Sequence, residues 1–119
     1  MAKYERRLKG DLNQLLNWLH ADITQSSVSA SFEDGSDVTM GETKMAVRVY
    51  ERFSMIGKNR VSLNLVLLGN GDDLFISAIT AGGSQAVLFK INVFGEEAFL
   101  NICQKSVENY IVHVNNSGV

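Results

Sequence analysis

Proline is absent from this chain of 119 residues, and cysteine and histidine are scarce. At average usage about six prolines would be expected, so their absence excludes proline-rich linkers and polyproline ligand segments. The only cysteine, Cys103, excludes an intramolecular disulfide, and one cysteine with two histidines offers too few ligands for a zinc site. We therefore expect a reduced protein that needs neither a metal ion nor another cofactor.

The chain also lacks a strong charge of one sign and long apolar runs. The net charge is −2 and the isoelectric point is near 5.6, whereas nucleic-acid-binding domains are usually basic, which argues against nucleic acid as a partner. Residues 1–7 carry positive charge with no apolar region behind them, so they do not form a signal peptide. No apolar run is long enough to span a membrane. These features predict a cytoplasmic protein without membrane contact.

The residues that are present have the composition of one soluble domain over 1–119. Hydrophobic residues make up 45% and charged residues 20%, close to the average of globular proteins. Surface scaling allows a chain of this mass to bury about two-thirds of its surface, so a core can form without disulfides.

Helical periodicity occurs in two places. Asp11 is suited to an N-cap, Gln14 follows it at capping-box spacing, and an apolar stripe then runs from Leu12 to Ile23. Near the other end, Glu96 and Glu97 suit the first turn of a helix. A second apolar stripe follows them, made of Phe99, Ile102, Cys103, Val107, Tyr110, Ile111 and Val114. Two amphipathic helices are therefore expected.

Between and before these helices, alternation of apolar and polar residues is typical of strands. It predicts strands over residues 3–9, 27–33, 43–55, 60–68 and 74–80, and a further short strand over 86–93. Turn residues separate them at Asp34-Gly35, at 57–59 and at Asn70-Gly71, the last being typical of a type I′ hairpin turn.

The element order is therefore β-α-β-β-β-β-(β)-α. It predicts an α+β fold in which an antiparallel sheet of four to six strands carries two amphipathic helices on one face. This order resembles the helix-grip and TATA-binding-protein-like folds, a likeness of topology that implies no function.

Four stretches carry a further resemblance, at residues 46–53, 59–63, 82–86 and 95–99. In these stretches the chain resembles a family of small uncharacterised bacterial proteins, a domain of unknown function. The resemblance implies a bacterial, cytoplasmic protein and brings no activity with it.

The main candidate binding site is the polar side of the predicted sheet. Arg48, Tyr50 and Arg52 share one side of a strand, and Arg60 and Asn64 share one side of the next. If these sides coincide, the guanidinium groups converge near a phenol, which suits an anionic small molecule or an acidic partner surface. The alternative is a solvated face on which arginine pairs with Glu51, which would need a bulge near residues 50–53.

Four other features of the sequence allow both a functional and an ordinary structural role. The Gly82–Gln85 segment could hold an anion or simply break a strand, and Cys103 could react with His20 or His113 or simply fill the core. The acidic segment 33–37 with Glu42 lacks the spacing of a calcium loop. Trp18 and Phe94 could line a cavity or complete the core.

Two functional hypotheses follow. The first is a non-enzymatic binding or interaction module that uses Arg48, Tyr50, Arg52, Arg60 and Asn64. The second is a small enzyme or carrier with a cavity between helix and sheet, its mouth near Trp18 and Phe94. We also expect a homodimer, formed through the helix-free sheet face or an edge strand. Strand 74–80 is apolar on both sides, so either Leu74, Ile76 and Ala78 or Phe75 and Ile79 must join Val66 and Leu68 on the helix-free face. Lysine at Ile76 is expected to place a charge in that interface and to give a monomer.

Overall fold

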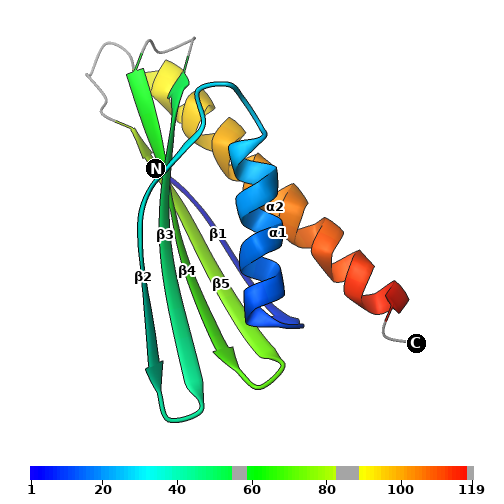
Figure 1. Ribbon diagram of the computed structural model, residues 1–119. Coiled ribbons are helices and arrows are strands. Elements are labelled where there is room, and N and C mark those ends of the chain that lie inside the picture. The colour runs from blue at the N-terminus through cyan, green and yellow to red at the C-terminus, as the bar shows by residue number, and fades with distance from the viewer. Residues whose placement is uncertain (55–58, 83–88, 118–119) are drawn as a thin grey trace.

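The structure is a computed structural model that describes residues 1–54, 59–82 and 89–117, with residues 89–94 described by their backbone alone. Its elements in chain order are β1 (Ala2–Lys9), α1 (Leu12–Thr24), β2 (Ser31–Met40), β3 (Thr43–Ser54), β4 (Asn59–Asn70), β5 (Asp73–Gly82) and α2 (Phe89–Ser117). This order confirms the predicted α+β class (Figure 1).

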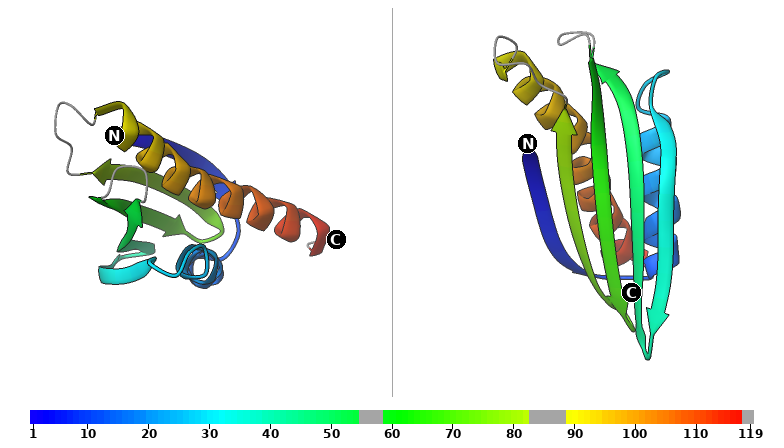
Figure 2. Two further views of the ribbon diagram at one scale, coloured as in Figure 1. Left: turned by 90° about the horizontal axis from the view of Figure 1, so that it is seen from above. Right: turned by 90° about the vertical axis from the view of Figure 1, so that its left-hand side faces the viewer.

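The five strands form one open antiparallel sheet in the order β1-β5-β4-β3-β2. β2 to β5 pair in sequence order, each with the next strand. The first strand, β1, pairs with the last strand, β5, along its whole length, from Ala2 opposite Thr80 to Lys9 opposite Asp73. β1 and β2 are therefore the two edges of the sheet, and they lie on opposite sides of the molecule (Figure 2).

Both helices pack on the same face of the sheet, as predicted (Figure 2). The core between the layers contains the leucine stripe of α1, alternate residues of β4 and β5, and the stripe of α2. Its fully buried members include Leu15, Leu19, Ile23, Leu63, Leu65, Leu67, Ile76, Phe99, Cys103, Val107 and Tyr110. Among the described residues no helix has both the length and the apolar character needed to cross a membrane.

The start of α1 shows how the helix layer is fixed to the sheet. Asp11 is the predicted N-cap, and its carboxylate accepts a hydrogen bond from the Gln14 backbone N–H at 2.9 Å. The Gln14 side chain does not complete a capping box. Its Oε1 accepts from the Tyr110 hydroxyl at 2.9 Å, and that hydroxyl accepts from the Asp11 N–H at 3.0 Å. A Cβ at Gly10 would lie 2.5 Å from the same hydroxyl, so this close approach requires glycine.

The start of α2 differs from the prediction. The helix begins at Phe89 rather than Glu96, so residues 89–93 of the predicted strand 86–93 are helical, and residues 86–88 lie outside the described part of the chain. The alternation of apolar residues there also places Phe89 and Val93 one helical turn apart, so periodicity alone did not decide between the two structures. Position 95 lies inside the helix and is occupied by glycine. A Cβ there would lie only 2.9 Å from Ser54 Oγ at the end of β3, so the close contact explains the glycine.

Two turns lie at other positions than the sequence predicts. Asp34-Gly35 is not a turn but lies within β2, where the register shifts between Phe32 and Asp34 and forms a bulge. The chain reverses instead at Gly41, between Met40 and Thr43, where φ is 61°. In the β4–β5 hairpin Asn70 pairs with Asp73, so the loop residues are Gly71 and Asp72, one position later than predicted.

Candidate functional site

The face of the sheet that carries no helix holds a group of apolar side chains, which we call the apolar band, with Asn64 and Ser77 between some of its members. It comes from four neighbouring strands, and its members are Val38, Met45, Val47, Val49, Val66, Leu68, Phe75 and Ile79. Residues directly opposite each other in adjacent strands share a face of the sheet, so the register places these side chains side by side.

Three cross-strand rows make up the band. The first row is Val38, Met45, Leu68 and Phe75, and the second contains Val47 opposite Val66. In the third, Val49 and Ile79 lie on either side of Asn64. Val38, Leu68 and Ile79 expose 41%, 37% and 38% of their surfaces, although each is large and apolar. Large apolar side chains gathered on an exposed face favour an interface.

A shallow hollow of about 370 Å³ lies at one end of the apolar band. Leu68, Phe75, Arg7 and Asp73 contribute to its lining, and the Arg7 guanidinium lies 5.8 Å above the centre of the Phe75 ring. The hollow could receive side chains from a facing surface, and the guanidinium offers that surface a charged margin.

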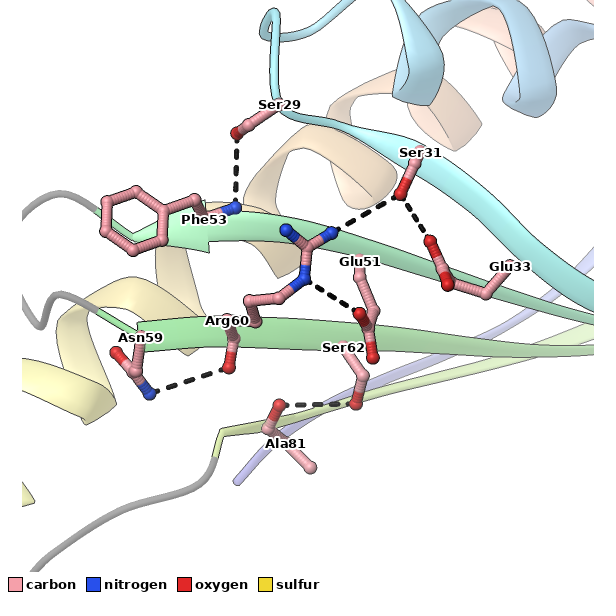
Figure 3. A network of polar contacts seen from close by, with 9 residues as sticks. All are labelled: Ser29, Ser31, Glu33, Glu51, Phe53, Asn59, Arg60, Ser62 and Ala81. Carbon is pink, nitrogen blue, oxygen red and sulfur yellow. Dashed lines mark hydrogen bonds and ion pairs between the residues drawn. The ribbon is translucent and has the colours of Figure 1, made fainter.

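Beyond the third row the same face becomes polar, and we call this region the polar zone (Figure 3). The Arg60 Nε donates to Glu51 Oε1 at 2.9 Å, and the other side of its guanidinium donates to Ser31 Oγ at 3.4 Å. The Ser31 hydroxyl also donates to the Glu33 carboxylate. These contacts join β2, β3 and β4 at one end of the sheet.

Asn64 lies at the boundary between the apolar band and the polar zone. Its side-chain N–H groups donate to the Ile79 carbonyl at 3.0 Å and to Ser62 Oγ at 3.1 Å. The Ser62 hydroxyl in turn donates to the Ala81 carbonyl at 3.2 Å. Both side chains thus bond to the carbonyls of β5, and the amide of Asn64 is held in place.

The predicted Arg/Tyr site is divided between the two faces of the sheet. Tyr50 pairs with Leu63 and Arg48 with Leu65, so Arg48, Tyr50 and Arg52 lie on the helix side. Arg60 pairs with Phe53 and Asn64 with Val49, so they lie on the helix-free side. The expected convergence is therefore wrong, because the face assignment of β3 relative to β4 is off by one residue. Arg60 reaches Glu51 without any bulge in β3.

On the helix side, the charged and phenolic groups of Arg48 and Tyr50 already have partners. The Arg48 guanidinium lies 3.0 Å from the Asp37 carboxylate and donates to the Val47 carbonyl at 2.8 Å. The hydroxyl of buried Tyr50 lies 2.8 Å from His20 Nδ1, and the Phe32 ring packs against both rings. Burial raises the pKa of Tyr50 to about 12, so its hydroxyl stays protonated at neutral pH.

Arg52 differs from the other two arginines of the predicted site. Its guanidinium lies 4.9 Å above the centre of the Phe99 ring, and partial burial lowers its pKa. Among the residues the structure describes, it has no carboxylate partner, whereas Arg48 has Asp37 and Arg60 has Glu51.

The other groups singled out in the sequence have structural roles where they are described. Cys103 is buried in the core, and burial raises the pKa of its thiol to about 12. His113 packs against Trp18, whose indole N–H donates to the Ser106 carbonyl at 3.1 Å. The acidic segment 33–37 lies in β2, and the described residues contain no cluster of metal-ligating side chains. Residues 83–85 and the Phe94 side chain lie outside the described part.

The chain was compared with protein families, with curated proteins and with solved structures. The model of DUF6054, a family of unknown function, matches residues 1–111. The chain belongs to this family. No curated protein and no solved structure matched it. The family match confirms the resemblance to a domain of unknown function.

The apolar band was predicted in part. Of the two possible sets in β5, Phe75 and Ile79 lie on the helix-free face with Val66 and Leu68, while Ile76 is fully buried under the helices. A charge at Ile76 would therefore disrupt the core, so it cannot test a dimer. In the sequence Met45, Val47 and Val49 alternate with Arg48, but their place in the band was not predicted. Their alternation was the available signal, and it lacked only the register with β4.

Proposed function

We propose that this protein is a non-enzymatic interaction module that forms a homodimer through the apolar band on its helix-free sheet face. The observation that carries the proposal is the band itself, eight apolar side chains on four strands with no helix above them. An antiparallel sheet normally exposes a face only if that face is polar, whereas the centre of this face carries the apolar band.

The sheet face is favoured over the edge strands. β1 has four basic residues and one acidic residue, and β2 has three acidic residues and a bulge. Charges and bulges on edge strands oppose pairing with another copy of the same edge. The face between these edges carries its apolar side chains at the centre and charges at its margins, which is the usual anatomy of an interface.

The test is the mass of the protein in solution. Size-exclusion chromatography with light scattering at tens of micromolar should give a dimer, and Leu68→Lys or Ile79→Lys should give a monomer because each places a charge in the buried centre. The matched control is Val112→Lys, at an exposed apolar residue of α2 away from the band, which should remain a dimer. Circular dichroism checks that each variant is folded. A monomeric wild type would overturn the proposal.

A second candidate function is the binding of a small anion at Arg52, and it keeps part of the predicted site. Its support is a half-buried guanidinium without a carboxylate partner among the described residues. Inorganic phosphate titrated against the wild type should shift NMR signals near Arg52, and Arg52→Gln should abolish the shift. Arg60→Gln is the control and should leave the shift unchanged, since Arg60 is paired with Glu51 on the other face. Equal shifts in all three proteins would reject this site.

A bacterial and cytoplasmic setting completes the proposal. The family resemblance supports it, and so does a single cysteine that is buried in the core.

A further inference from the structure

The two margins of the helix-free face carry opposite charge. On this face the β1 margin presents Lys3, Arg7 and Lys9 with one carboxylate, Glu5, while the β2 margin presents Asp34. The register fixes these positions. Lys3, Glu5, Arg7 and Asp34 lie in cross-strand rows with members of the apolar band, and Lys9 lies opposite Asp73, one row beyond it.

The third row shows the asymmetry most clearly. Across the sheet from β2 to β1 it contains Asp34, Val49, Asn64, Ile79 and Lys3. Asn64 on the central strand β4 is flanked on each side by an apolar residue and then by a charge. The two terminal charges have opposite sign, so the row is complementary to a reversed copy of itself.

A symmetric dimer that packs these faces together has two simple choices of two-fold axis. An axis parallel to the strands reverses the strand order, so β1 faces β2 of the partner subunit and each row faces its own reversed copy. An axis across the strands keeps the strand order and reverses the rows, so β1 faces β1 and Lys3 faces the Arg7 region of the partner subunit. The first choice opposes unlike charges and the second opposes like charges.

We propose that the homodimer packs its two sheets face to face about a two-fold axis parallel to the strands, with Lys3 of each subunit opposite Asp34 of the other. This inference rests on the proposed function and adds the orientation of the partner. Phe75 then faces Met45 of the partner subunit, and Leu68 faces its own symmetry mate.

The side chains of Lys3 and Asp34 are suited to an ion pair between the two subunits. Both side chains are exposed, and neither has an ion-pair partner within the described part of the chain, whereas Lys9, Arg48 and Arg60 do. The Asp34 carboxylate accepts only a local hydrogen bond, from the Gly35 N–H at 2.7 Å. Packed sheets lie about 10 Å apart, a gap that an extended lysine and an aspartate can close together.

Charge reversal at the two positions tests the orientation. Lys3→Glu alone and Asp34→Lys alone should each weaken the dimer about tenfold, because each creates two like-charge contacts per dimer. The double variant should regain the wild-type affinity. When the two single variants are mixed, native mass spectrometry should show mainly the heterodimer, in which both contacts are again between opposite charges. Lys44→Glu, an exposed lysine on the helix side of β3, is the control and should behave as the wild type.

The outcomes separate this inference from the proposed function. A monomeric wild type overturns both. A dimer that Lys3→Glu strengthens indicates the axis across the strands and overturns the orientation alone, as does a dimer that neither reversal affects. A ladder of masses above the dimer would indicate that β1 of one copy pairs with β2 of the next along the sheet edges, and it would overturn the face-to-face arrangement.

Discussion

The two faces of the sheet are built from adjacent residues of the same strands, yet they have different surroundings. On β4, Leu63, Leu65 and Leu67 are fully buried beneath the helices, while the neighbouring Val66 is half-buried and Leu68 is exposed on the other side of the strand. The two faces differ less in their number of apolar side chains than in how much of that apolar surface the helices cover. Apolar residues on both sides of a strand are normally buried on both sides, so Val66 and Leu68 support the proposed partner on the helix-free side.

The polar residues of β3 also support a partner on the helix-free side. Arg48 and Arg52 lie on the helix side, where α1 and α2 leave the margin of the sheet accessible, and both guanidinium groups find partners there. The helix-free side of β3 contains Met45, Val47 and Val49 instead. In β3, therefore, the side that faces the helices is the more polar one, which a two-layer fold with a solvated outer face does not explain.

The largest expected difference between the faces is in the free energy of unfolding. Leu65→Ala should lower it by about 2–5 kcal/mol, because a cavity opens in a closely packed core. Val66→Ala, made in the Leu68→Lys background that we expect to be monomeric, should lower it by about 1 kcal/mol because Val66 is only half-buried there. Urea denaturation followed by circular dichroism measures both.

In the wild-type background the cost of Val66→Ala should rise with protein concentration, because dimerisation stabilises the folded state by mass action. Equal and concentration-independent losses for Leu65→Ala and Val66→Ala would show that the two faces are not differently covered.

The sequence contained enough information for the helix layer apart from the start of α2. The stripes of α1 and α2 have a period that only a helix satisfies, and the Asp11 cap marks the first of them. The strands from Thr43 to Gly82 were predicted within a few residues because their alternation is long and is punctuated by glycine. Local patterns were sufficient for these features because each element determines them by itself.

The face assignment and the close approaches required information that no single element contains. Alternation in β3 separates Met45 and Val47 from Arg48 but does not say which set faces the helices, and the pairing with β4 decides this. Gly10 and Gly95 are further examples, because their absent side chains make room for Tyr110 and Ser54, which lie far away in the sequence. The candidate site depends on exactly such pairings, so it was predicted less well than the fold.

The reactivity of Cys103 should sharpen the contrast between the covered and the uncovered face. A thiol reagent should modify Cys103 about 100-fold or more slowly than a free cysteine, because the core must open first. In a Cys103→Ala background, Ser77→Cys on the helix-free face should react faster than Cys103 does. Diluting the protein should accelerate it further if the band is covered in a dimer.

The same thiol gives a pH dependence whose sign follows from burial. Folding raises the pKa of Cys103 from 9.0 to about 12, so the unfolded chain loses this proton first as the pH rises. The free energy of unfolding should therefore fall between pH 9 and pH 12. Tyr50 contributes in the same direction from pH 10 upward. Cys103→Ala should reduce the fall, and an unchanged slope would show that the thiol is not buried.

The smallest expected effect concerns the Arg60–Glu51 ion pair in the polar zone. Arg60 exposes 50% of its side chain and Glu51 exposes 35%, so water screens the pair and their coupling should be about 0–1 kcal/mol. A double-mutant cycle with Arg60→Gln and Glu51→Gln measures this coupling by urea denaturation, and added salt should reduce it further. The Arg48–Asp37 pair, on the opposite face of the sheet, is the internal comparison. A coupling well above 1 kcal/mol at Arg60 alone would mean that the polar zone is shielded from water in solution, and the surface of the partner would then extend beyond the apolar band.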